Sequence, residues 1–361
     1  MEKYFLFLML SILSSVSMWG QSVFEVNGIS YRIIKEADES ATFGTVHVCS
    51  KKNGKYEGNI NIPNAIKQGS DKYADSYKVV GIDDEAFANC EDLNSVTLPP
   101  SIEILGKRAF SESGIKKISI PYGNLQSISE YAFFSSSLQS ISLPKCIQKI
   151  EPIAFGQCME LESFSSEGII EIGIGAFNSC SNLKTVNLPE TLLRIGEGAF
   201  RDCGFTKIKL PNSLTSIGNS AFSGCDALLS ITIPQQITQI EEYTFFLCKK
   251  IESIKLPSSL TRIKEGAFSL CDNLSSIEIP GKITEIGDRA FYGCENMKSL
   301  YLKTKTPPML VKLKGKGKET SLFFEDKKPT CKIYVPKESL NSFMSAKVWE
   351  PYKDMIEPYS Y

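Results

Sequence analysis

His47 and Cys49, near the N-terminus, are the residues whose types and spacing most resemble a catalytic pair. His47 is the single histidine among 361 residues. Val46 and Val48 alternate with the pair, which places His47 and Cys49 on one side of a predicted strand. An imidazole beside a thiol could activate it as a nucleophile. Neighbours on one strand need not align for proton transfer, however, and the sequence offers no third group to orient the imidazole. We therefore predict no catalytic residue and no enzyme.

A run of three acidic residues, Asp83, Asp84 and Glu85, could be interpreted as a carboxylate cluster. It precedes Phe87 at a position where the related segments of the chain carry ordinary polar residues. Acidic side chains also favour the first residues of a helical turn. The sequence therefore predicts a solvated turn here.

A basic, glycine-containing segment covers residues 312–318. A phosphate-binding loop would need a preceding strand, a following helix and a Gly-Lys-Ser/Thr ending. Those features are missing, so we predict a solvated loop, with contact to acidic glycans as the alternative.

The chain has eleven cysteines, and eight of them recur at one position of a repeated pattern. Residues at one repeat position point in parallel along a stack, which suits small buried groups better than disulfide geometry. No close pair of Cys or Cys/His ligands recurs at metal spacing, so we predict neither zinc nor any other metal or cofactor. Cys49, Cys146 and Cys331 lie outside the pattern and remain unassigned. The eight are Cys90, Cys158, Cys180, Cys203, Cys225, Cys248, Cys271 and Cys294.

The overall charge is balanced, with 40 Lys+Arg, 41 Asp+Glu and a formal net charge of -1. This balance gives no electrostatic reason to expect nucleic acid or an anionic membrane as a partner. Hydrophobic residues make up 42% of the chain, which is enough for a large core.

The element that must position the acidic run and the eight recurring cysteines is a repeat of 22 or 23 residues, marked by phenylalanine. Ala precedes this Phe in nine cases and Thr244 in the tenth, and an aliphatic residue lies five positions before it. Ser113 and Ser136 replace the cysteine that otherwise follows three positions later. The phenylalanines are Phe87, Phe110, Phe133, Phe155, Phe177, Phe200, Phe222, Phe245, Phe268 and Phe291.

Each unit predicts the same local structure. From Ile277 to Ile279 apolar and polar residues alternate, which predicts a short strand. Pro280 has no N–H and ends it. A second extended piece runs to Ile286, where Gly287 permits a corner. The Ala-Phe-x-x-Cys segment then predicts a helical turn with Phe and Cys pointing inward. Stacked units would bury one another's apolar sides, with neighbouring strands about 4.8 Å apart.

The unit Ile-Gly-x-x-Ala-Phe-x-x-Cys-x-x-Leu-x-x-Ile-x-Leu-Pro resembles the BspA-like class of leucine-rich repeats. Residues 217–234 match it almost residue for residue, and the resemblance covers about residues 79–302. It implies a right-handed leucine-rich-repeat solenoid with short parallel strands on a concave face. It also implies surface or secreted proteins of host-associated microbes that bind matrix proteins or other cells.

The two flanks are predicted to be caps. Residues 1–20 have the charge, short apolar run and small residues of a signal peptide, with cleavage near Gly20. That run is too short to span a membrane, and no later segment is apolar enough. Residues 21–78 predict a small β-rich N-terminal cap. Residues 303–361 predict an α/β cap whose helix, residues 337–348, places Leu340, Phe343, Met344 and Val348 on one side.

The predicted binding surface consists of the two polar residues that flank the central aliphatic of each strand. Serine and threonine dominate it, and its later half is more basic. Two interpretations remain open: these residues simply tolerate exposure, or they form a polar platform for a protein or glycan. The scarcity of aromatic residues argues against tight sugar binding. The candidate residues are Thr185, Asn187, Lys207, Lys209, Ser230, Thr232, Ser253, Lys255, Ser276, Glu278, Ser299 and Tyr301.

These observations predict a non-enzymatic, exported binding or adhesion protein at the cell surface or outside the cell, with the periplasm as a further possibility. Its partner would be a protein or a glycan. The alternative is a structural or scaffolding solenoid of a cell-envelope complex, in which the C-terminal cap makes the contact.

Overall fold

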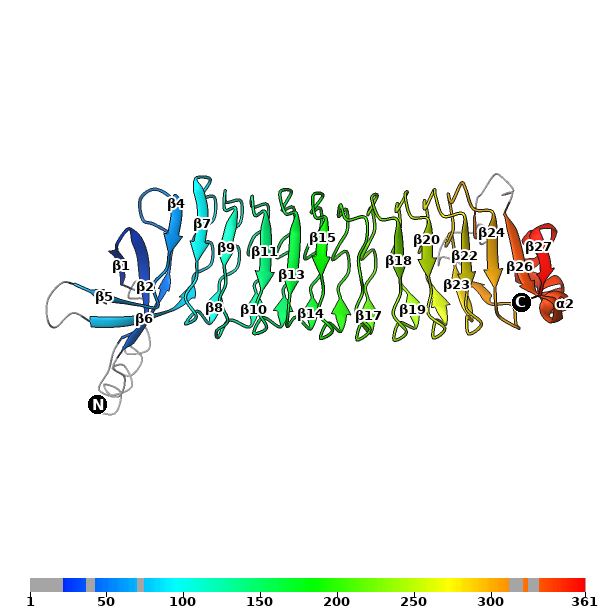
Figure 1. Ribbon diagram of the computed structural model, residues 1–361, viewed down its shortest axis with the longest axis horizontal. Helices are drawn as coiled ribbons and strands as arrows, with labels where there is room; N and C mark the ends of the chain where they lie inside the picture. Colours follow the sequence, from blue (N-terminus) through cyan, green and yellow to red (C-terminus); the bar gives the residue numbers. More distant parts are fainter. Residues whose placement is uncertain (1–21, 37–42, 70–74, 312–320, 324–330, 361) are drawn as a thin grey trace, which may run out of the picture.

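The computed structural model describes residues 22–36, 43–69, 75–311, 321–323 and 331–360. These residues form a long, nearly straight rod of stacked coils with a small sheet at the N-terminal end and a helical cap at the other (Figure 1). The predicted solenoid is therefore confirmed. The strand-bearing side lacks, in this view, the marked concavity that the resemblance implied. The predicted signal peptide and the basic segment 312–318 lie outside the described residues.

The coils contribute strands to a parallel arrangement along the rod, which we call the strand face; in one coil the segment 207–209 takes the place of the strand and makes only an isolated bridge. Partner residues are one repeat apart, as in Ser163 with Thr185, so every coil presents the same positions outward. The strands are β4 Gly58–Asn61, β7 Leu93–Thr97, β9 Lys117–Ser119, β11 Ser140–Leu143, β13 Ser163–Ser166, β15 Thr185–Asn187, β18 Ser230–Thr232, β20 Ser253–Lys255, β22 Ser276–Ile279, β24 Ser299–Leu302, β26 Lys332–Pro336 and β27 Ile356–Tyr359.

A second parallel column, the short-strand column, carries the aliphatic residue that precedes each phenylalanine. Ile150, for example, pairs with Ile172 in the next coil. Its strands are β3 Gly44–Val48, β6 Asp75–Ile82, β8 Ile104–Leu105, β10 Ser127–Ile128, β12 Lys149–Ile150, β14 Glu171–Ile172, β16 Arg194–Ile195, β17 Ser216–Ile217, β19 Gln239–Ile240, β21 Arg262–Ile263, β23 Glu285–Gly287 and β25 Met309–Val311.

The third side of each coil, the turn column, holds the Ala-Phe-x-x-Cys segment. It consists of turns, not of the helical turn expected from the sequence. Gly198 and Asp202 have φ of 57° and 56°, on either side of Phe200. Alternate N–H groups then point to the next coil: the N–H of Phe200 donates to the carbonyl of Ala221 at 2.9 Å. A helix would satisfy these donors within one coil, whereas here they join neighbouring coils.

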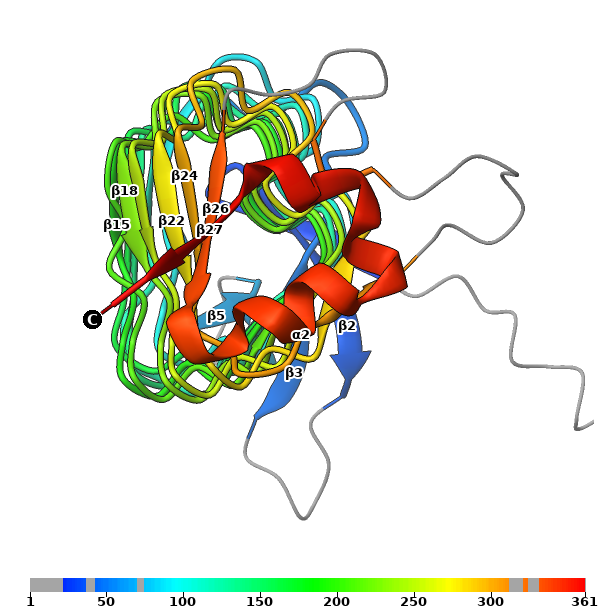
Figure 2. The ribbon, with the colours of Figure 1, turned by 90° about the vertical axis from the view of Figure 1, so that its right-hand side faces the viewer.

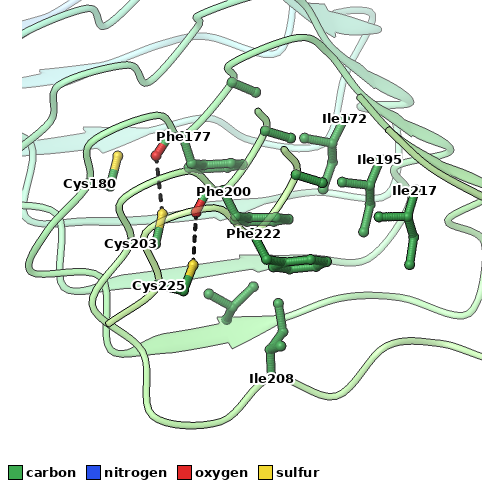
Figure 3. Close-up of a cluster of buried hydrophobic side chains, with 14 of the residues drawn as sticks. Ile172, Phe177, Cys180, Ile195, Phe200, Cys203, Ile208, Ile217, Phe222 and Cys225 are labelled. Atoms are coloured by element: carbon green, nitrogen blue, oxygen red, sulfur yellow. Dashed lines mark hydrogen bonds between the residues drawn. The ribbon is translucent and has the colours of Figure 1, made fainter. Parts of the chain in front are cut away.

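The phenylalanines of the turn column form one continuous stack through the core, of which Figure 3 shows Phe177, Phe200 and Phe222. From Phe87 to Phe291, successive ring centroids lie between 4.9 and 5.8 Å apart and the rings tilt by at most 12°. All ten rings are fully buried. The stack extends beyond the repeats on both sides, to Tyr56 at 4.6 Å and to Phe323 at 6.0 Å.

The cysteines of the turn column donate hydrogen bonds as well as filling space. The Sγ of Cys203 lies 3.2 Å from the carbonyl oxygen of Phe177 in the preceding coil, and Cys225 repeats this contact with Phe200 at 3.1 Å (Figure 3). Ser113 instead bonds the carbonyl of Phe110 in its own coil at 2.8 Å. All eleven cysteines are free, as the sequence predicts for the eight that recur at one repeat position, which we call the cysteine ladder.

The glycine that directly follows the short strand in several coils allows neighbouring coils to pack closely. A Cβ on Gly106 would lie 2.3 Å from the backbone of Asp83, and one on Gly218 would lie 2.5 Å from the backbone nitrogen of Glu197. Neither glycine has a positive φ. Contact with the preceding coil, not the corner conformation that the sequence suggested, therefore favours glycine at these positions.

The N-terminal end is β-rich. Strands β1 Val23–Val26, β2 Ile29–Lys35 and β5 Ala65–Gln68 join β3 and β6 in one sheet, in the order β1-β2-β3-β6-β5. β3 and β6 continue into the short-strand column, and β4 continues into the strand face. The sheet and the coils thus share strands.

The α-helix of the C-terminal cap is shorter than the predicted helix of residues 337–348, and 3-10 helices flank it. It comprises the 3-10 helix η1 Lys337–Ser339, the α-helix α2 Leu340–Ser345 and the 3-10 helix η2 Lys347–Met355, which cover the end of the rod (Figure 2). Phe343 and Trp349 are buried, and the indole N–H of Trp349 donates to the carbonyl of Pro308 at 2.8 Å.

The expected apolar side of that helix is only partly correct. Met344 and Val348 are 39% and 49% exposed. Ala346 is extended, with ψ of 115°, and breaks the helix between them. Val348, which lies beyond the break, therefore no longer follows the 3.6-residue period from which the common side was predicted, whereas Met344 lies within α2 and nothing in the structure explains its exposure.

Candidate functional site

The structure places the predicted binding residues together on the strand face. All twelve lie on the outer side of its strands or of the equivalent segment 207–209, and between them the aliphatic side chains of each strand point into the core. Ser230, Ser299 and Tyr301 are half-buried and the other nine are exposed. Period-two alternation on a sheet with one buried side explains this separation.

Three lysines give the later half of this face free positive charge. Lys207, Lys209 and Lys255 are exposed, and no ion pair joins them to a carboxylate of the described chain. The acidic residue of the same face behaves differently, because Glu278 pairs with Lys303 at 2.5 Å. The sequence indicated the basic character but not this pairing.

The ladder of strands is interrupted where the surface is hollowed. β18 and β20 form one sheet, and β22, β24, β26 and β27 form another. A groove of about 840 Å³ crosses this interruption. It lies within the volume range of small-molecule sites, although its hydroxyl-rich and charged lining is more polar than is typical of them. Of the predicted residues it contains Ser230, Thr232, Ser253, Lys255, Ser276 and Glu278.

A second, smaller hollow of about 240 Å³ lies at the other interruption, beside β15. Asn187 and Lys209 line it. Between β15 and β18, Lys207 makes only an isolated bridge to Ser230. Thr185, Lys207, Ser299 and Tyr301 line neither hollow.

An aromatic cluster at the C-terminal end of the strand face was missed in the sequence. Tyr301 of β24 stacks on Tyr334 of β26, with ring centroids 4.8 Å apart and planes 16° apart. Tyr359 of β27 lies edge-on to both, at 5.6 and 6.4 Å. Only Tyr301 belongs to the repeat; the other two join it because the cap adds β26 and β27 to the same face. The strand face therefore has aromatic surface that the repeat pattern alone did not show.

Arg32, His47 and Asp83 form a cluster at the N-terminal end, which corrects the solvated-turn prediction for Asp83, whereas Asp84 and Glu85 are exposed turn residues as predicted. The Nδ1 of His47 lies 2.9 Å from Oδ1 of Asp83, and Nε of Arg32 donates to Oδ2 of Asp83 at 2.6 Å. The Asp83 side chain is only 12% exposed, so it is not part of a solvated turn. Burial opposes its ionisation, but the hydrogen bonds from His47 and Arg32 outweigh this and lower the pKa of Asp83.

The cluster supplies the orienting group for His47 that the sequence did not show. Cys49 is nevertheless a poor nucleophile, because burial, assisted by the charge of Asp83, raises the pKa of its thiol to about 11. At neutral pH the thiol is therefore protonated and unreactive. Gly81 faces the imidazole so closely that a Cβ there would lie 2.5 Å from its Nε2. The cluster joins β2, β3 and the end of β6.

The cysteine ladder shows no sign of metal chemistry. Burial raises the pKa of Cys248 and Cys294 to about 12. Metal binding needs thiolates, which this environment disfavours. Within the ranges that the structure covers, no group of three or more His, Cys, Asp or Glu residues could hold a metal ion. None of the helices in those ranges combines the length and apolar character needed to cross a membrane.

Stacked coils whose strand face, short-strand column and turn column all run along the rod define a parallel β-solenoid repeat protein. The model of the BspA type leucine-rich repeat region, in six copies, matches residues 80–204 and 193–307. The chain belongs to this family. A search of curated proteins finds no match.

Several solved structures are similar to the chain. A leucine-rich repeat protein from Bacteroides ovatus is 22% identical, with 93% of this chain and 100% of that chain covered and a TM-score of 0.43. A leucine rich cell surface protein from Faecalibacterium prausnitzii is 21% identical, with coverages of 82% and 96% and a TM-score of 0.42. The pneumococcal vaccine antigen PcpA is 20% identical, with coverages of 94% and 97% and a TM-score of 0.49.

Proposed function

We propose that this protein is a non-enzymatic binding protein, and that its strand face contacts a protein or glycan ligand at the cell surface or outside the cell. The observation that carries the proposal is the groove across the interruption between β20 and β22, which contains six of the twelve candidate residues. A long rigid stack of coils holds these side chains in fixed positions, as a recognition surface requires.

The location is supported by the family and by the N-terminal sequence. Residues 1–20 have the pattern of a signal peptide. One of the similar structures is described as a cell surface protein and another as a vaccine antigen. The proposal places this chain in the same kind of environment.

The experiment reverses the free charge of the strand face. Lys207→Glu, Lys209→Glu and Lys255→Glu, combined in one variant, should weaken capture on immobilised extracellular-matrix proteins or envelope extract at least about tenfold, because charged residues on a contact surface govern association. A charge-matched control changes three exposed lysines that lie outside the strand face: Lys145→Glu, Lys249→Glu and Lys250→Glu. Equal binding by the two triple variants would remove the strand face from the proposal.

A second candidate function, scaffolding through the C-terminal cap, is favoured by the exposed apolar side chains of Met344 and Val348. Deletion of the whole cap would be uninformative, since it would remove the buried Phe343 and Trp349. The variant Met344→Ser/Val348→Ser keeps them. Loss of envelope association in this variant, with matrix capture unchanged, would favour scaffolding over strand-face binding.

A further inference from the structure

The tyrosine cluster, defined as Tyr301, Tyr334 and Tyr359, continues the strand face beyond the repeats. Tyr301 and Tyr334 are register partners on adjacent strands, so their parallel rings stack along the rod axis. Tyr334 covers one side of the Tyr301 ring. The other side is directed toward β22, whose residue in the same register is Glu278.

Glu278 connects the tyrosine cluster to the groove. It lines the groove together with Ser253 and Ser276, and its partner Lys303 lines it too. Next to Tyr301, the strand face therefore carries the carboxylate of Glu278 and the ammonium group of Lys303, and the hydroxyls of Ser276 and Ser253 follow along the groove. On the far side of the cluster, Lys332 and Glu357 repeat the arrangement with an ion pair at 2.7 Å.

We propose that the tyrosine cluster and the adjoining groove bind a neutral oligosaccharide that lies along the rod axis. This inference rests on the proposed function and names its ligand class. A pyranose ring has a face of C–H groups, which suits the electron-rich face of an aromatic ring, and an edge of hydroxyls, which suits carboxylate and hydroxyl partners. Tyr301 supplies the aromatic ring for the C–H face, and Glu278, Ser253 and Ser276 supply the carboxylate and hydroxyl partners for the hydroxyl edge.

The lining of the groove favours a neutral ligand. Its two carboxylates, Glu252 and Glu278, are balanced by the ammonium groups of Lys255 and Lys303, so the groove has no excess of positive charge to attract sialylated or sulfated glycans. An apolar small molecule would leave its many hydroxyl and charged groups without partners. An extended peptide could also lie at the interruption between β20 and β22, and the experiment must therefore include peptides.

The test is capture of the purified full chain on an array that carries neutral oligosaccharides, acidic oligosaccharides and unrelated peptides. Tyr301→Leu removes the aromatic face but retains an apolar side chain, and Tyr301→Phe retains the ring. We expect Leu to weaken binding of neutral oligosaccharides roughly tenfold, and Phe to change it less than about twofold. Tyr122→Leu is the control, because Tyr122 is 72% exposed and lies off the strand face.

Each outcome decides the inference. Unchanged affinity for neutral oligosaccharides in a folded Tyr301→Leu variant would overturn the site. Capture by acidic oligosaccharides or peptides alone would overturn the ligand class, while sensitivity to the lysine reversals would still uphold the proposed function. Absence of binding to the array, together with matrix capture that the lysine reversals do not weaken, would overturn both.

Discussion

The stacked coils and the N-terminal sheet are stabilised in different ways. In the coils, each layer repeats the same apolar contacts, so Phe200 has neighbours much like those of Phe177 and Phe222. In the N-terminal sheet, Arg32, His47 and Asp83 form one charged cluster at the junction with the first coil. Apolar stabilisation is thus distributed along the rod and continues into the sheet through buried residues such as Val46 and Val79, but the junction adds a partly buried cluster centred on the Arg32–Asp83 ion pair.

The largest effect should follow from removing one ring of the stack. Phe200→Ala should lower the free energy of unfolding by about 3–5 kcal/mol, because it leaves a cavity between two buried rings. Denaturant unfolding measures the change. Phe246→Ala, at a half-buried position of the turn column, is the control and should cost clearly less. If the two variants lose equal free energy of unfolding, a ring in the stack contributes no more stability than the half-buried ring of Phe246.

A smaller effect should follow from Asp83→Asn, which keeps the size of the side chain but removes its charge. We expect a loss of about 2 kcal/mol at neutral pH, because Arg32 and His47 lose their charged partner. Asp84→Asn is the control, since Asp84 is exposed and an amide oxygen can still accept from the N–H of Lys107.

The same variant tests the pH dependence. The folded-state pKa of Asp83 is lowered, so its contribution is fully present above its unfolded pKa of about 3.9 and is lost as the pH falls through the lower folded value. Unfolding curves between pH 3 and 7 should therefore show a flatter acid limb for Asp83→Asn than for the unsubstituted protein. Parallel acid limbs would contradict an ionised cluster at the junction.

The smallest effect concerns the thiol hydrogen bonds within the coils. Cys203→Val removes the donor to Phe177, whose carbonyl still accepts from the N–H of Cys180 at 3.2 Å. Cys203→Ser retains a donor at a position where two other coils already carry serine. We expect Val to cost about 1 kcal/mol more than Ser. If Val is the better tolerated of the two in denaturant unfolding, packing alone explains the cysteines.

The sequence by itself determined the coils and the strand face. Phe, Cys and aliphatic residues recur every 22 or 23 positions, and stacking requires equal positions to become neighbours. The alternation around each central aliphatic then predicted which residues face solvent, and Thr232, Lys255 and Glu278 are exposed as predicted. The periodic part of the fold was predictable because each coil solves the same local packing problem.

Only the tertiary structure decided the contacts that break the period. Phe323 extends the aromatic stack although it lies 32 positions after Phe291, and Tyr334 joins Tyr301 because the cap supplies another strand. Asp83 likewise accepts a hydrogen bond from Arg32, which lies 51 positions away in the sequence, in the N-terminal sheet. No repeat spacing relates these residues, and pairing between distant segments depends on how the ends of the chain fold back onto the stack.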